Sequence, residues 1–206
     1  MRVGTDYLSR VRQHLFESAE VKCQIAETCV ESIAAAANLL ADTYRSGGKV
    51  LLCGNGGSAA DCQHMAAELV NRLTSDFERP GLPAIALTTD TSFITAYAND
   101  CMFEGVFERQ VQALGNPVDT LVAISTSGNS ANVLRAITAA QSANMRTIAI
   151  TGTGGRLNRV VDLAISVPST NAQCIQEAHL AIEHMLCHLV ERILFGDEAH
   201  GEDPAL

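Results

Sequence analysis

The sequence predicts an α/β fold in which helices at the N-terminus precede a doubly wound parallel sheet of five strands. Short, continuously apolar runs alternate with longer segments of helical periodicity, as in a parallel sheet covered by helices on both faces. Two of these runs end in turns rich in glycine, serine and asparagine, at residues 54–58 and 125–130. Such turns present free backbone N–H groups and hydroxyls at a helix start, which suits a phosphate or a sugar.

The first helical region covers residues 1–46, which we assign to the same domain as the sheet. Apolar residues recur at helical spacing from about Tyr7 to Tyr44, and Ser46-Gly47-Gly48 ends the pattern. This spacing predicts two helices. We assign residues 47–195 to the ligand-binding part and residues 196–206 to an acidic tail.

The predicted strands and the remaining helices alternate along the chain. The strands are Val50–Cys53, Ala84–Leu87, Leu121–Ile124, Thr147–Ile150 and Ala164–Val167. The helices are Ser58–Leu73, Thr91–Asn99, Phe103–Leu114, Ser130–Asn144, Leu157–Val161 and Asn171–Leu194. If the first and third strands are neighbours, as in the flavodoxin-like order 2-1-3-4-5, both glycine-containing turns face one crevice.

Charge and composition exclude several classes of function. The formal net charge is −9, and Lys22 and Lys49 are the only lysines, which argues against nucleic-acid binding and against Schiff-base chemistry. No charge-free stretch reaches about 18 residues, and the first residues lack a signal peptide's apolar core, so we expect a cytoplasmic protein without a membrane span. The seven cysteines contain no C-x-x-C pair, and we expect them to be reduced and buried.

The turn after the third strand is the best phosphate cradle in the chain. It carries four hydroxyls within six residues, and Gly128 allows the backbone to approach a ligand closely. One of these residues could simply cap the helix that follows. Because four hydroxyls exceed what capping requires, we favour phosphate binding by Ser125, Thr126, Ser127 and Ser130.

Two helices carry candidate metal ligands and acid–base groups. His64 and Glu68 lie four residues apart and so share one helix face, amid apolar neighbours where a carboxylate needs a partner or a function. On the last helix, His184 and His188 could form a zinc pair at i, i+4, and Gln176 could meet His179 at i, i+3. The spacing alone does not choose between these pairs.

At these residues the chain resembles the sugar isomerase (SIS) domain family, and within it the phosphoheptose isomerases of bacterial heptose biosynthesis. The resemblance extends over about Ser46 to Phe195. The matching segments are residues 53–58, Gln63-His64 with Glu68-Leu69, Arg79-Pro80 with residues 83–87, residues 98–100, residues 124–133, and Ile175-Gln176-Glu177 with His179. Together these segments are highly specific, whereas either glycine turn alone is weak.

The resemblance implies a role for each matching residue. Asn55, Gly56, Gly57, Asn99 and Asp100 would hold the sugar hydroxyls, and Ser125, Thr126, Ser127 and Ser130 would take the phosphate. One zinc ion per subunit would be held by His64, Glu68, Gln176 and His184, of which Glu68 and Gln176 would also touch the substrate. The resemblance thus favours His184 over His188. It also implies a homotetramer packed through the N-terminal helices.

The implied reaction converts sedoheptulose 7-phosphate into D-glycero-D-manno-heptose 7-phosphate for the lipopolysaccharide core, through an enediolate. Glu68 would be the base and His184 the acid, with zinc as a Lewis acid at the carbonyl oxygen. Since zinc weakens a carboxylate as a base, Glu68 must loosen when substrate binds, or share its role with water or His184. The alternative is a non-catalytic SIS protein that binds a phosphosugar or the replication initiator. Because Glu68 and His184 are both present, we favour the enzyme.

The chain departs from the family pattern at two places. Cys174 stands where relatives often have an arginine, so we do not expect in this chain the phosphate or interface contact that such an arginine would make. Residues 73–78 are about two residues longer than the usual link. Neither departure touches the implied metal and catalytic residues.

Overall fold

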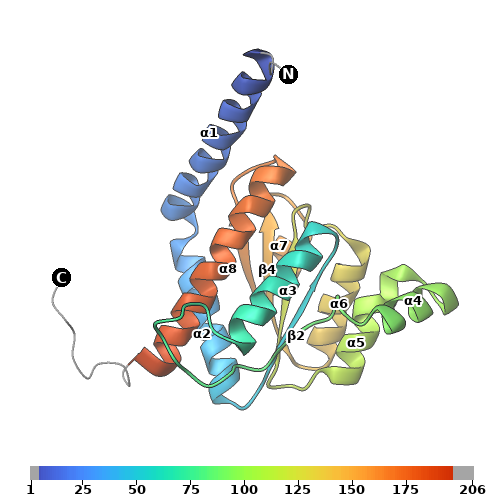
Figure 1. Ribbon diagram of the computed structural model, residues 1–206. Coiled ribbons are helices and arrows are strands. Elements are labelled where there is room, and N and C mark those ends of the chain that lie inside the picture. Colours follow the sequence, from blue (N-terminus) through green and yellow to red (C-terminus); the bar gives the residue numbers. More distant parts are fainter. Residues whose placement is uncertain (1–4, 197–206) are drawn as a thin grey trace.

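The computed structural model describes residues 5–196, in which a parallel sheet lies between two layers of helices (Figure 1). The strands are β1 (Val50–Gly54), β2 (Ala84–Ala86), β3 (Thr120–Ser125), β4 (Arg146–Gly152) and β5 (Leu163–Val167). All neighbouring strands pair in parallel, in the order β2-β1-β3-β4-β5. The predicted fold class and strand order are therefore confirmed, and the two glycine-containing turns follow neighbouring strands.

The central strands are apolar throughout because both of their faces are covered. Every residue of β1 and β3 is buried. Along β1, Val50 and Leu52 pack into one apolar cluster, whereas Leu51 and Cys53 pack into the cluster on the other face. This alternation explains why the strands read as continuous apolar runs rather than as alternating polar and apolar residues.

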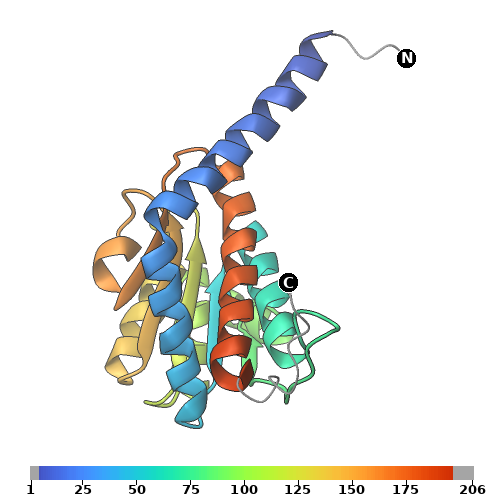
Figure 2. The same ribbon diagram turned by 90° about the vertical axis from the view of Figure 1, so that its left-hand side faces the viewer.

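One face of the sheet is covered by α2 (Val30–Arg45), α3 (Gly57–Val70) and α8 (Ala172–Phe195), whose apolar residues join one cluster. The helix α1 (Thr5–Thr28) precedes α2 and is separated from it at Cys29, so the predicted pair of N-terminal helices is present. The first half of α1 projects beyond the sheet and the helices that cover it (Figure 2).

The other face is covered by α4 (Thr91–Asp100), η1 (Phe103–Gly105), α5 (Val106–Leu114), α6 (Ala131–Ser142) and α7 (Leu157–Val160). The predicted segment Phe103–Leu114 divides into a short 3-10 turn and a helix. The predicted helix Ser58–Leu73 ends earlier, at Val70, where the Arg79 guanidinium binds the backbone carbonyls of Glu68 and Leu69. A side chain that donates hydrogen bonds to these carbonyl oxygens takes the place of the backbone N–H groups that would continue the helix.

Among residues 5–196, no helix combines the length and the apolar character that crossing a membrane requires. The acidic tail that we assign to residues 196–206 lies, except for Gly196, outside the described residues.

Candidate active site

The turns after β1 and β3 are joined by a reciprocal pair of amide hydrogen bonds. The Asn55 Nδ2 donates to Asn132 Oδ1 at 2.8 Å, and the Asn132 Nδ2 donates to Asn55 Oδ1 at 2.8 Å. Asn55 lies directly after β1, and Asn132 lies in the first turn of α6. The pair therefore fixes the two turns side by side at the carboxyl edge of the sheet, where ligands bind in doubly wound folds.

The turn after β3 is shaped by its own hydroxyls. The Ser125 Oγ accepts a hydrogen bond from Gly128 N at 3.2 Å and lies 3.3 Å from Ser130 Oγ. Ser130 occupies the N-cap position of α6, but its side chain makes no capping hydrogen bond. The hydroxyl of Ser130 therefore does not satisfy the first N–H groups of the helix, and these groups suit an anion.

Gly128 adopts a backbone conformation, in a confined space, that no other residue type adopts without strain. Its φ is +61°, and a Cβ there would lie 2.7 Å from Thr151 Oγ1 and 2.9 Å from Gly155 Cα. A side chain at this position would push the turn away from β4 or open the turn itself. The glycine thus keeps the cradle closely packed against the neighbouring strand end.

The turn after β1 brings the last helix against the start of α3. A Cβ on Gly57 would lie 1.8 Å from Gln176 Nε2, so only glycine leaves room for the Gln176 amide. The same Nε2 donates to Asp61 Oδ2 at 3.2 Å. A cavity of about 130 Å³ beside this turn is lined by Asn55 and Gly56 together with Thr88, Phe103 and other residues.

The candidate acid–base residues meet between α3 and α8. The Nε2 atoms of His64 and His184 lie 2.9 Å apart, and the His64 Nδ1 lies 4.0 Å from Glu68 Oε1. All three side chains are half-buried. Because α3 and α8 pack side by side (Figure 1), His64 and Glu68 of one helix lie beside His184 of the other. His188, one turn further along α8, is half-buried and lies nearer the end of that helix.

The donor set between these helices fits a zinc ion in its chemistry. Two imidazole nitrogens, the Glu68 carboxylate and the Gln176 amide oxygen are ligands of a kind that zinc accepts. No three His, Cys, Asp or Glu side chains of residues 5–196 already surround one point. Two Zn–N bonds of 2.0–2.1 Å at a tetrahedral angle require about 3.3 Å between the nitrogens. The 2.9 Å between the two Nε2 atoms is close to this separation.

Two fully buried polar side chains on α8 were not among the predicted site residues. Within residues 5–196, neither the ring nitrogens of His179 nor the carboxylate oxygens of Glu183 have a hydrogen-bond partner, and both residues are 0% exposed. Burial lowers the pKa of His179 to about 4, against a smaller opposing effect of the Thr151 backbone. Burial, together with the negative charge of Asp61, raises the pKa of Glu183 to about 8. At neutral pH both side chains are therefore predominantly uncharged.

Asp61 is a further residue that the sequence analysis missed. Burial raises the pKa of Asp61, while its hydrogen bond from Gln176 and the charge of His64 oppose the shift. Asp61 lies three residues before His64 on α3, and this helical spacing was a signal that could have identified it. Asn132 could likewise have been identified, because it follows the phosphate turn directly.

The structure does not bring Asn99 and Asp100 to the histidine pair. They are exposed at the end of α4, and the Asn99 Nδ2 donates to Asp100 Oδ1 at 2.9 Å. Figures 1 and 2 place α4 on the far side of the molecule from α8. Cys174, the departure from the family pattern, is buried in the first turn of α8. A sugar contact by Asn99 or Asp100 remains a prediction.

Comparisons with known proteins show the family to which the chain belongs. The family model of the SIS domain matches residues 13–152. A phosphoheptose isomerase from Roseiflexus sp. (strain RS-1) is 54% identical over 179 residues, covering 86% of this chain and 90% of the relative. One from Chlorobaculum tepidum is 49% identical and covers 93% of this chain and 92% of the relative.

Solved structures give the same result. The structure of a phosphoheptose isomerase from Neisseria gonorrhoeae superposes with a TM-score of 0.84 at 43% identity, over 90% of this chain and 98% of that one. The one from Francisella tularensis gives a TM-score of 0.86 at 40% identity, with the same coverage of both chains. The fold and the match to the family model define a SIS-domain protein. Within that class, the chain belongs to the phosphoheptose isomerase family.

Proposed function

We propose that this protein is an aldose–ketose isomerase that converts sedoheptulose 7-phosphate into D-glycero-D-manno-heptose 7-phosphate. The observation that carries the proposal is the placement of a carboxylate, Glu68, and an imidazole, His184, on facing helices beside two ligand-binding turns. An isomerase of this kind moves a proton between C1 and C2 through an enediolate, which needs a base, an acid and a held phosphate. Glu68, His184 and the turn at residues 125–130 are the groups that we propose for these three tasks.

Glu68 is the proposed base and His184 the proposed acid. The His64 imidazole lies between them, with its Nδ1 toward Glu68 and its Nε2 toward His184. Glu68 takes the proton from one carbon of the substrate, and His184 gives a proton to the oxygen that carries the developing negative charge. Half-burial of both groups reduces the contact of these protons with water.

We propose that His64, Glu68, Gln176 and His184 hold a zinc ion. When bound, zinc would supply Lewis-acid polarisation of the substrate carbonyl. Support comes from the donor set between α3 and α8 and from the fit of Gln176 against Gly57. The Asp61 carboxylate accepts a hydrogen bond from Gln176 Nε2, which leaves the amide oxygen free to act as the ligand atom.

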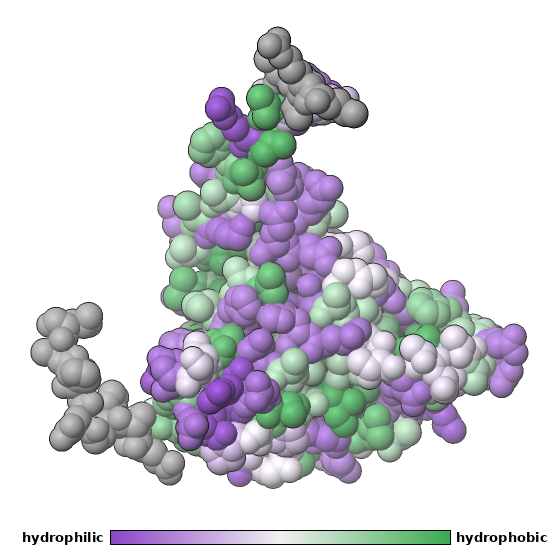
Figure 3. Space-filling view, in the orientation of Figure 1, coloured by the Kyte–Doolittle hydropathy of each residue, from purple (hydrophilic) through white to green (hydrophobic). Residues whose placement is uncertain are grey.

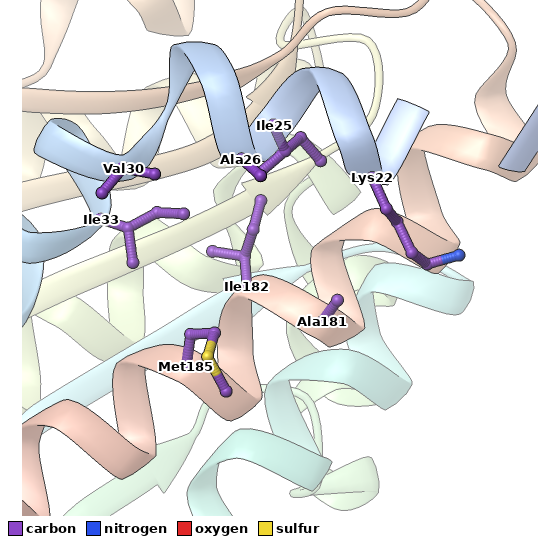
Figure 4. A pocket seen from close by; sticks show the side chains of 8 residues that line it. All are labelled: Lys22, Ile25, Ala26, Val30, Ile33, Ala181, Ile182 and Met185. Carbon is purple, nitrogen blue, oxygen red and sulfur yellow. The ribbon is translucent and has the colours of Figure 1, made fainter. Parts of the chain in front are cut away.

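We also propose that copies of the chain assemble as the homotetramer that the family resemblance implies. Exposed apolar side chains gather on the projecting part of α1, namely Tyr7, Leu8, Val11, Leu15 and Phe16, and Figure 3 shows this hydrophobic surface. An apolar cavity of about 300 Å³ lies between α1, α2 and α8 (Figure 4). Burial of such surfaces against other copies is favourable, since exposed patches of this kind commonly mark interfaces.

Sedimentation of a Val11→Glu variant tests this assembly. The change should reduce the assembled species, because it places a charge on the exposed apolar face of α1. Val118→Glu is the matched control, since the two valines are similarly exposed, Val118 at 48% and Val11 at 57%. Val118 lies away from α1, just before β3 at the amino edge of the sheet. Equal sedimentation of wild type and Val11→Glu would reject an interface through α1.

A further inference from the structure

A buried ion pair between Arg79 and Glu191 joins the segment after α3 to the C-terminal part of α8. These two helices carry the proposed acid–base residues. The Arg79 side chain is 0% exposed and the Glu191 side chain 2% exposed. The Arg79 Nε and Nη2 each lie 2.8 Å from Glu191 Oε1. The same oxygen accepts a hydrogen bond from Leu73 N at 3.1 Å. The Glu191 carboxylate of α8 therefore binds the segment that follows α3 at two points, the Arg79 side chain and the Leu73 backbone.

The two terminal nitrogens of the same guanidinium also bind the end of α3. The Arg79 Nη2 donates to the carbonyl oxygen of Glu68 at 2.8 Å, and Nη1 donates to that of Leu69 at 2.7 Å. Carbonyls in the last turn of a helix have no partner within the helix, and a cation there also complements the helix dipole. Arg79 therefore holds the backbone of the very residue whose carboxylate is the proposed base.

Glu191 is equally well placed relative to the proposed acid. It follows His184 by seven residues on α8, which is two helical turns, so both side chains project from the same face, about 10 Å apart along the axis. One guanidinium thus connects the backbone of Glu68 on α3 to the helix that carries His184.

We propose that Arg79 and Glu191 are positioning residues that set the distance between the Glu68 carboxylate and the His184 imidazole. This proposal rests on the function proposed above. Rigid packing of α3 against α8 alone would tolerate small sliding movements, whereas three hydrogen bonds from one planar guanidinium fix both direction and distance. Displacement of an acid–base group by about 1 Å can lower turnover about 100-fold, so such a restraint matters for catalysis.

The test is Arg79→Lys, which keeps the positive charge and the ion pair. A single ammonium group cannot reach Glu191 and both carbonyls of α3 in the planar arrangement of the guanidinium. We expect kcat to fall about 10- to 100-fold with little change in KM, because the phosphate turn lies on other elements. Glu191→Gln keeps an oxygen acceptor and carries the same expectation if Arg79→Lys does not fold.

The chain offers a matched control in a second ion pair, which joins the segments before β1 and β3 and touches neither α3 nor α8. The Lys49 Nζ lies 2.6 Å from Asp119 Oδ2, with side chains 21% and 2% exposed, directly before β1 and β3. Lys49→Met should lower the melting temperature without changing kcat. A kcat that falls as much in Lys49→Met as in Arg79→Lys, at a similar melting temperature, would reduce Arg79 to a purely structural role and overturn the proposal.

A second readout does not depend on turnover. The ring ¹⁵N signals of His64 and His184, whose Nε2 atoms lie 2.9 Å apart, should shift in Arg79→Lys and stay unchanged in Lys49→Met. If wild-type protein shows no isomerase activity, the proposed function fails, but these signals still decide whether Arg79 positions the pair. Unchanged kcat and unchanged ring signals in a folded Arg79→Lys or Glu191→Gln variant would contradict the proposal.

Discussion

The Nε2 atoms of His64 and His184 lie 2.9 Å apart, although 120 positions separate the two residues in the chain. This contact exists because α3 follows β1, α8 follows β5, and both helices pack on one face of the sheet. The fold therefore brings side chains from the first half of the chain to side chains of its last helix.

Replacing Glu68 with glutamine should lower kcat about 10²–10⁴-fold, the usual contribution of general acid–base catalysis. Glutamine keeps the shape of the side chain and removes the base. Far-UV circular dichroism should stay unchanged, because the half-buried Glu68 side chain belongs to neither apolar cluster. A variant that retains activity within about threefold of wild type would remove Glu68 from the mechanism.

Changes in the phosphate turn should act chiefly on KM. Ser127→Ala removes a hydroxyl near the ligand, and hydrogen bonds to charged groups contribute about 1.5–3 kcal/mol. Gly128→Ala should raise KM further, since its Cβ would lie 2.7 Å from Thr151 Oγ1. Steady-state kinetics with inorganic phosphate as a competitor measures both effects. Loss of kcat at unchanged KM would contradict the assignment of this turn to the phosphate.

His184→Asn and His188→Asn should behave differently. The first removes a proposed zinc ligand and the proposed acid, so zinc stoichiometry and turnover should fall together. The second changes a histidine one turn further along α8, and we expect a stability change of at most about 1–2 kcal/mol with zinc and activity intact. Zinc analysis and rate measurements on both variants decide the matter. Loss of zinc in His188→Asn alone would reverse the assignment.

His179 should make the protein less stable in mild acid. Burial lowers its pKa from 6.5 to about 4 in the folded state. Between these values the unfolded chain binds a proton that the folded protein does not, so the free energy of unfolding falls as the pH falls. The limit is about 1.4 kcal/mol for each pH unit.

Urea unfolding at pH 7 and at pH 5 measures this effect. Wild type should lose up to about 2 kcal/mol more than His179→Leu over that interval, because leucine does not titrate. Equal losses in the two proteins would show that His179 is not held in its neutral form.

Much of the fold could be predicted because its signals are local. The five strands are continuous apolar runs, and their turns contain the glycines that the backbone requires at Gly56 and Gly128. The end of α3 was predicted three residues too late, because it depends on Arg79 binding the carbonyls of Glu68 and Leu69. That contact is tertiary, and helical periodicity does not reveal it.

The site was harder to predict for the same reason. Helical spacing allowed His184 to pair with His188, and only the packing of α8 on α3 brings His184 to His64. The burial of His179 and Glu183 depends on which face of α8 meets the sheet, and the sequence alone left that face open. Asn99 and Asp100 came from the family resemblance, and within one chain they lie away from the histidine pair.

The most direct test of the account is incubation of the purified, zinc-loaded protein with sedoheptulose 7-phosphate in D₂O, followed by NMR. We predict an aldose 7-phosphate with deuterium incorporated at C2, because the enediolate takes its new proton from a group that exchanges with solvent. The Glu68→Gln variant should form neither product nor deuterated ketose at a comparable rate. A folded wild-type protein that leaves the ketose unchanged and undeuterated would contradict the isomerase function.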